Sequence, residues 1–187
     1  MKKLAILSMT FLLTVAVTQG QTQKADKEKV KETKKELKTE RIALKKLEGT
    51  NVSTVAKENF IADFKDAKNV EWKRVDTFDK ATLTNKDGQS ISAYYDIDGK
   101  LVGTTQYKTF ADVPVRGQTE IKKMYKDYAI GSVVFFDDNE LNPTDMILYN
   151  IQFDDADNYF VELSKGTKKI VVQVNTEGDL FFFKDLQ

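Results

Sequence analysis

The stretch SISAYYDIDGKLVGTT, residues 90–105, contains a turn that sets the register of two predicted strands. Its centre, DIDG, has the composition of a type I turn: an aspartate side chain can bond the backbone two residues on, and glycine can adopt the positive φ that closes the turn. In that geometry Tyr95 pairs with Leu101 across a hairpin. The stretch therefore predicts antiparallel strands with Tyr95 on the buried face and Tyr94 on the opposite one.

Two other pieces carry the same turn chemistry, NKDGQ at 85–89 and NTEGD at 175–179. Each opens with asparagine and has glycine at its fourth position. The same rule yields two further inward-facing apolar pairs, Leu83 with Ile91 and Val174 with Leu180. One turn rule thus places an apolar pair on the inward face of all three hairpins. This favours a structural role for these pieces over a metal-binding one.

The residue spacing in and after DIDGK differs from that of a calcium-binding EF-hand loop. Glycine follows the second aspartate directly, and Tyr107 stands where an EF-hand needs glutamate. Asp154, Asp155 and Asp157 are a better cation candidate, whose alternative interpretation is a solvated hairpin loop. We predict no metal site and no cofactor.

Catalysis is restricted by composition, because the chain contains neither cysteine nor histidine. Ser-His-Asp and Cys-His mechanisms, and metal sites built on cysteine or histidine, are excluded. The enzyme alternative would use paired carboxylates, for which Asp137, Asp138 and Glu140 are the candidates. We predict no catalytic residue and no enzyme activity.

Export is predicted by residues 1–20, in which MKK precedes about 14 mostly apolar residues, too few to span a bilayer. Small residues near Gly20 favour cleavage that leaves Gln21 first. No cysteine follows for a lipid anchor, so we expect a periplasmic or secreted protein without a transmembrane segment after cleavage.

A charged arm, predicted helical or flexible, covers residues 21–49. From Lys24 to Glu48, ten lysines or arginines face six acidic residues, whereas from Gly49 onward the numbers are 17 and 23. The acidic remainder argues against nucleic-acid binding. Apolar residues recur every seventh position at Val30, Leu37 and Leu44, but the second apolar column of a coiled coil is missing. We expect a monomer, with an arm-mediated dimer as the alternative.

The remainder, residues 50–187, is predicted to be an α+β domain built as a tandem repeat, about 52–110 and 111–187. Helices are expected from Ser53, the N-cap, to about Asp66 and from about Arg116 to Asp127. The second has one buried stripe, made of Ile121, Met124, Tyr125 and Tyr128. Each is followed by strands that alternate in apolar character and form an antiparallel sheet. The second copy includes DMILYNIQF, expected as one strand, and carries extra chain around DDNELNPTD.

Four pieces resemble the PepSY-like, β-lactamase-inhibitor-like family of exported Gram-negative proteins: FKDAKNVEWKR, SISAYYDIDGKLVGTT, the DVP before the second helix, and IVVQVNTEGDL. The resemblance covers about Val52 to Asp185. It implies tandem repeats of one helix and an antiparallel sheet, similar in layout to proteins that inhibit β-lactamases or bind peptidases. It implies no catalytic residues.

The first functional hypothesis is an exported, non-catalytic protein-binding module, of the kind that inhibits a peptidase or another hydrolase. Its partner would be an exported or envelope protein. The predicted register places Tyr94, Phe181 and Phe183 on the face opposite the core, so these are the candidate binding residues. The inward set is Tyr95, Val172, Val174, Leu180 and Phe182, and Trp72 is expected in the core.

Two alternatives remain beside this hypothesis. The three outward aromatic residues could instead be covered by the arm or by the other repeat. The protein could also carry a small apolar ligand between helix and sheet.

Overall fold

A computed structural model describes residues 51–186, so the predicted signal peptide and charged arm lie outside the described residues. Helices α2 and α3 and a 3-10 turn, η1, accompany ten strands in this part of the chain. In chain order the elements are α2 Thr54–Asp63, β1 Lys68–Val75, β2 Phe78–Thr84, β3 Ser90–Tyr95, β4 Leu101–Lys108, η1 Phe110–Asp112, α3 Val115–Met124, β5 Ala129–Asp138, β6 Met146–Leu148, β7 Ile151–Phe153, β8 Asn158–Lys165, β9 Lys168–Asn175 and β10 Leu180–Leu186.

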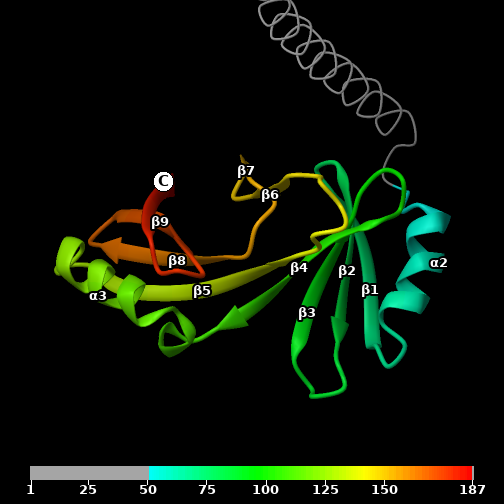
Figure 1. Cartoon of the computed structure of the whole chain (residues 1–187), viewed down its shortest axis with the longest axis horizontal. Coiled ribbons are helices and arrows are strands. Elements are labelled where there is room, and N and C mark those ends of the chain that lie inside the picture. The colour runs from blue at the N-terminus through cyan, green and yellow to red at the C-terminus, as the bar shows by residue number, and fades with distance from the viewer. Residues whose placement is uncertain (1–50, 187) are drawn as a thin grey trace, which may run out of the picture. The chain divides into compact units, whose positions relative to one another are not determined.

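Eight strands form one antiparallel sheet in the order β1-β2-β3-β4-β5-β8-β9-β10, and β6 pairs with β7 separately. Each half of the large sheet follows one helix in the chain, α2 before β1 to β4 and α3 before β5 to β10. Pairing of β4 with β5 joins the halves. Figure 1 shows β1 to β3 running across the direction of β5 and β8, so the sheet twists strongly between its halves.

Both predicted helices are present and are slightly shorter than expected. The Ser53 hydroxyl accepts a hydrogen bond from the backbone N–H of Ala56 at 3.5 Å, which confirms the N-cap. In α3, Ile121 is buried as predicted. Met124, predicted in the same buried stripe, is 64% exposed, whereas the next residue, Tyr125, packs against the cluster that contains Ile121, so the buried side of the helix passes through Tyr125 and not through Met124.

The three turns confirm the predicted register. Gly88, Gly99 and Gly178 all have positive φ, and the opening Asn85, Asp96 and Asn175 each accept backbone hydrogen bonds through their side chains. The predicted apolar pairs are observed: Leu83 with Ile91, Tyr95 with Leu101, and Val174 with Leu180. Local turn chemistry therefore fixes which face each of these side chains occupies.

The helices cover one face of the large sheet. Under α2, Phe60 packs with Tyr95 and with Trp72. Trp72 is partly buried and packs against the cluster, so its predicted place in the core is confirmed in part. Under α3, Ile121 belongs to a second cluster with residues of β5, β8 and β9. The two clusters lie on the same face of the sheet. Ile91, which packs against the first cluster, pairs with a residue of β4, which pairs with a residue of β5, which pairs with Tyr159 beside the second cluster. Residues paired directly across neighbouring strands point to the same face.

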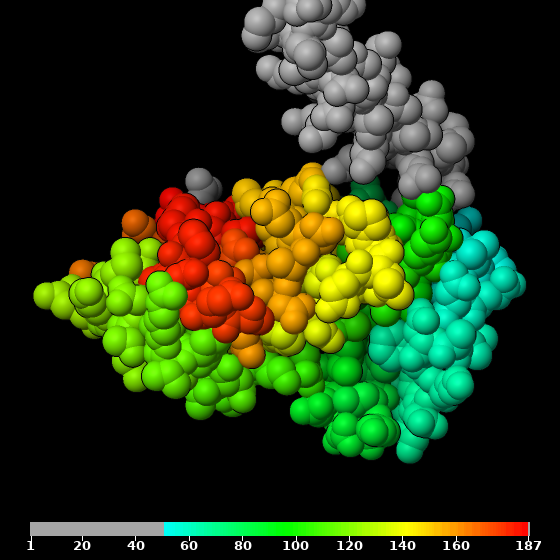
Figure 2. Space-filling model, in the orientation of Figure 1, coloured from blue at the N-terminus to red at the C-terminus, as the bar shows by residue number. Residues whose placement is uncertain are grey.

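The opposite face carries a third core cluster, which draws residues from both halves of the sheet. Its buried members are Phe78, Tyr94, Val102, Phe136, Met146, Phe153, Phe160 and Val171. Met146 and Phe153 come from β6 and β7, which reach this face as a hairpin inserted between β5 and β8. Figure 2 shows the inserted segment, in yellow and orange, between green residues of the first half and the red C-terminal strand.

The prediction of DMILYNIQF as one strand is wrong. Tyr149 and Asn150 have φ values of 52° and 61°, which turn the chain back on itself, so the stretch forms the β6–β7 hairpin. Two consecutive residues with positive φ are the geometry of a tight hairpin turn. This turn is hard to predict from sequence, because tyrosine is uncommon at a position with positive φ.

The inserted segment is anchored near its start and at the tip of its hairpin. The Asn142 amide donates to the Asp96 carboxylate and to the carbonyl of Leu101, both at 3.0 Å. At the hairpin tip, the Lys184 ammonium donates to the carbonyl of Tyr149. The turn of the opening stretch therefore also serves as the docking point for chain 46 residues further on.

Candidate functional site

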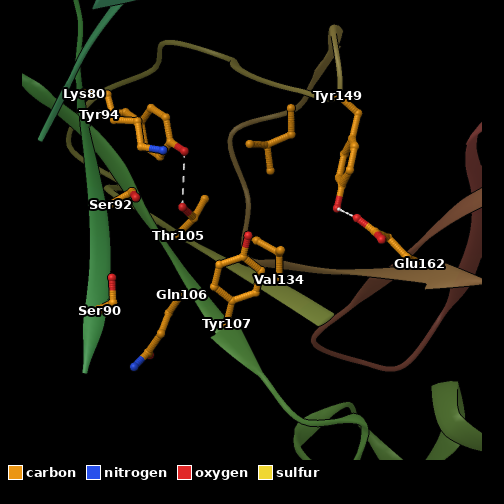
Figure 3. Close-up of a pocket in the computed structure, with 11 residues that line it drawn as sticks. Lys80, Ser90, Ser92, Tyr94, Thr105, Gln106, Tyr107, Val134, Tyr149 and Glu162 are labelled. Carbon is orange, nitrogen blue, oxygen red and sulfur yellow. Dashed lines mark hydrogen bonds between the residues drawn. The ribbon is translucent and has the colours of Figure 1, made fainter. Parts of the chain in front are cut away.

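An open pocket of about 250 Å³ lies on the sheet face opposite the helices, beside the β6–β7 hairpin. Its walls come from β2, β3, β4, β5 and β8 and from the hairpin tip. The lining residues are Lys80, Ser90, Ser92, Tyr94, Thr105, Gln106, Tyr107, Val134, Leu148, Tyr149 and Glu162. Figure 3 shows Lys80 and Glu162 on opposite sides, with Tyr94, Thr105 and Tyr107 between them.

Tyr94 forms an inner part of this pocket. It is 6% exposed, and its hydroxyl lies 3.3 Å from the Thr105 hydroxyl. Burial raises the pKa of Tyr94, an effect that the bond to Thr105 opposes, so the phenol remains protonated at neutral pH. The Lys80 ammonium lies 5.7 Å from the ring centroid of Tyr94, within reach of a cation–π contact.

Tyr149 forms the facing wall. Its hydroxyl donates to the Glu162 carboxylate at 3.0 Å, as Figure 3 shows. Burial and, after it, the charge of Glu162 raise the pKa of Tyr149. Its left-handed backbone is uncommon for a bulky residue and is held by the bonds to Glu162 and Lys184. The hairpin thus presents the ring to the pocket in a fixed position.

Side chains that carry hydroxyl groups line the β3 wall of the pocket. Ser90, Ser92 and Tyr94 occupy alternate positions and so share a face. Within residues 51–186, neither serine side chain has a hydrogen-bond partner among the other residues. Both serine hydroxyls are consequently available to a ligand.

The three predicted binding residues share the predicted face but differ in accessibility. Tyr94 is buried beneath the inserted segment, and Phe183 is half-buried against Phe153 and Phe160. Phe181, by contrast, is 53% exposed. Its register with Gln173, and from there with Phe160, places it on the expected face.

Phe182 was expected to point inward, and this expectation is wrong in part. Its pairing with Val172 does place it on the helix side of the sheet. However, the side chain is 57% exposed, because β10 is the outermost strand and no core cluster reaches this position. The predicted register was correct, but a register does not show how far the residues that cover this face of the sheet extend.

The candidate carboxylates do not form a facing pair. Asp137 is paired with Thr104 and Asp138 with Gly103, so as neighbours on a strand they point to opposite faces. Burial and then the charges of Asp155 and Asp157 raise the pKa of Asp138 to about 6. Glu162 is the one carboxylate among the lining residues of the described pocket.

Sequence reasoning missed most of the pocket. Ser90 and Ser92 could have been found, because the confirmed register places them on the same face as Tyr94. Tyr149 could not, since its position depends on the hairpin that the sequence did not predict. The pocket also lies on the sheet face opposite the one where an apolar carrier was expected to hold its ligand.

Solved structures show where this architecture has been seen before. A BLIP-like protein from Bacteroides fragilis is 16% identical, with a TM-score of 0.56 over 73% of this chain and 87% of the other. The fold is BLIP-like. A DUF2874 family protein from Bacteroides uniformis shares it at 12% identity, with a TM-score of 0.59 over 72% and 90% of the two chains.

A third structure with this BLIP-like fold belongs to a protein proposed to be periplasmic, from Bacteroides eggerthii. It is 11% identical, with a TM-score of 0.58 over 72% of this chain and 89% of the other. No protein-family model and no curated protein matches the chain. Among residues 51–186, neither helix has the length and apolar character needed to cross a bilayer.

Proposed function

We propose that this BLIP-like protein is an exported, non-catalytic module that binds another protein along its edge strand β10. The observation that carries the proposal is the pair Phe181 and Phe182, which are 53% and 57% exposed on one of the two edge strands of the large sheet. Native sheets usually protect such edges with charge or cover, and large exposed apolar side chains are frequent interface anchors.

The geometry favours an extended segment with apolar side chains as the bound part of the partner. Phe181 is in register with Gln173 and Phe182 with Val172, so their rings flank the edge on both sides of the sheet. A strand added to β10 would bond the backbone and place alternate side chains against both rings. Phe183, which packs against Phe153 and Phe160, then supports this surface from the core.

An envelope peptidase or other hydrolase is the partner class we propose to test first. The BLIP-like fold and the neighbour proposed to be periplasmic support this choice.

The predicted internal duplication is supported by the order of elements, since each half has one helix and four strands of the large sheet.

The test is capture of a partner from an envelope extract of the source organism, followed by binding measurements with the purified partner. Phe181→Ala with Phe182→Ala should weaken binding about tenfold, the effect of losing one to two anchors. Val115→Ala with Met124→Ala, a control that removes apolar side chains 77% and 64% exposed on α3, should bind normally. Equal binding by both double variants would refute the proposal.

A further inference from the structure

We infer that the pocket beside the β6–β7 hairpin binds an uncharged sugar ring, the end or one unit of a glycan. This site is separate from β10, since none of its lining residues belongs to that strand. The inference therefore adds a ligand to the proposed protein-binding function and does not depend on it.

Charge indicates a neutral ligand. Lys80 and Glu162 are the charged lining residues, one of each sign, and Figure 3 shows them on opposite sides of the pocket. Glu162 already accepts a hydrogen bond from Tyr149 at 3.0 Å. An anionic or cationic ligand would meet attraction on one side and repulsion on the other.

Aromatic rings provide surfaces against which the apolar C–H face of a sugar can pack. Tyr107 is 75% exposed although its strand lies inside the sheet, so its ring is open to a ligand. Tyr149 faces the pocket from the hairpin, fixed in a strained backbone conformation. Strain of this kind persists where the surroundings hold it, and it often occurs at binding sites.

Hydroxyl groups provide the polar partners. The Ser90 and Ser92 hydroxyls make no hydrogen bond to another residue of the described part of the chain, and each can donate one bond and accept others. A purely apolar ligand would leave these groups without partners and would lose the water that solvates them. The mixture of rings and hydroxyls suits a molecule that is itself apolar on one side and hydroxylated at its rim.

Size limits the ligand to about one ring. The volume of about 250 Å³ lies below the roughly 300–1,000 Å³ typical of pockets for drug-sized ligands. The pocket is open to solvent, so further units of a glycan can extend outward. Gln106 lines the rim, but Figure 3 shows its side chain pointing away, and we assign it no contact.

The test is a titration of the ¹⁵N-labelled protein, followed by NMR, with glucose, galactose and N-acetylglucosamine and with trisaccharides of each. We expect saturable shifts of the Ser92, Thr105 and Tyr107 amide signals for at least one sugar, with a millimolar Kd for a single ring. Decanoate, an apolar chain that ends in a carboxylate, and inorganic phosphate, an anion without an apolar part, serve as alternative probes of the same pocket.

Variants identify the contacts. Tyr107→Ala should weaken sugar binding about fivefold and Tyr107→Phe should retain it, since the ring and not the hydroxyl supplies the packing. Ser92→Ala should weaken it about threefold through one lost hydrogen bond. Phe182→Ala is the matched control, an exposed aromatic residue outside the pocket, and should bind sugar normally while affecting partner capture.

Three results would overturn the inference: no sugar shifts these signals, decanoate or phosphate binds the pocket in place of every sugar, or Tyr107→Ala binds as well as the native protein. Dispersed spectra of each variant show that it is folded. Because partner capture depends on β10, its failure and the failure of sugar binding are separate outcomes.

Discussion

Asp96 performs two tasks with one carboxylate. One oxygen accepts the backbone N–H groups of Asp98 and Lys100, at 2.8 and 3.0 Å, and closes the turn. The other accepts the amide of Asn142 at 3.0 Å. The first task is an ordinary property of aspartate in a turn, and the second appears only when distant chain folds back onto it.

Gly99 is predicted to tolerate no side chain. Its φ is +73°, and an added Cβ would lie 2.8 Å from the backbone nitrogen of Ala56 and from a methyl group of Val55. Gly99→Val should lower the free energy of unfolding by about 3 kcal/mol, through backbone strain and overpacking against α2. Urea denaturation measures the change.

Gly88 offers the matched control. Its φ is +77°, but nothing lies within 4 Å of an added Cβ. Gly88→Val should therefore cost only about 1 to 2 kcal/mol, the strain of a left-handed residue. Equal losses in the two variants would show that contact with α2 contributes nothing at Gly99.

Asp138 is predicted to make stability depend on pH. Its pKa is raised from 3.8 to about 6, chiefly by burial, so the folded chain holds this proton more tightly than the unfolded chain. The Asp138 contribution to the free energy of unfolding therefore falls as pH rises from 3.8 to about 6 and stays low above that. Asp138→Asn should reduce this decline and stabilise the protein at pH 7.

Chemical denaturation of both proteins at several pH values checks this prediction. Asp66→Asn removes one exposed charge away from the acidic loops and controls for net charge. An identical pH dependence in Asp138→Asn and the native protein would contradict the role given to Asp138.

The inserted hairpin is the element that most distinguishes the two halves. It covers apolar residues of the second half, such as Phe136 and Phe160, and leaves the Ser90 and Ser92 hydroxyls of β3 open. The hairpin covers the part of the surface whose burial stabilises the fold most. Burying apolar area is favourable, whereas burying a hydroxyl without a hydrogen-bond partner costs free energy. The pocket forms where the cover ends.

Asn142 is predicted to hold this element in place. The side chain is 5% exposed, and its amide bonds Asp96 and the carbonyl of Leu101. Asn142→Ala should lower the free energy of unfolding by about 2 kcal/mol, since it removes the amide donor from the buried Asp96 carboxylate, while the Leu101 carbonyl keeps its bond from the Asn139 amide.

Hydrogen exchange of the β6 and β7 amides should show the same loss locally, with faster exchange in Asn142→Ala than in the native protein. Leu141→Ala changes the adjacent side chain, which is 92% exposed, and should alter neither quantity. Unchanged exchange in Asn142→Ala would mean that the apolar contacts of Met146 and Phe153 hold the hairpin alone.

Across the whole molecule, the two halves of residues 51–186 are predicted to unfold together. The sheet continues through the pairing of β4 with β5, and one core cluster combines Phe78 and Tyr94 with Phe160 and Val171. Neither half can lose its structure without exposing apolar surface of the other.

Trp72, the single tryptophan, lies in the first half and reports on it by fluorescence. Amide signals of β8 and β9 report on the second half by NMR. The two urea transitions should coincide, and separate midpoints would show that the halves are independent folding units.

Sequence alone determined what neighbouring residues can encode. The turn pieces set three registers, the alternation of strands set the faces of Tyr94 and Tyr95, and Ser53 set the start of α2. These features depend on hydrogen bonds and steric contacts within a few residues, so they can be inferred from the local sequence.

The tertiary structure decided which of those faces are covered. Tyr94 and Phe183 are covered by residues of a hairpin inserted far along the chain, while Phe181, Phe182 and Tyr107 stay open. Cover results from contacts between residues distant in sequence, here 46 positions apart for Asp96 and Asn142, and no local pattern records them. The same physical reason explains why the pocket became visible only in three dimensions.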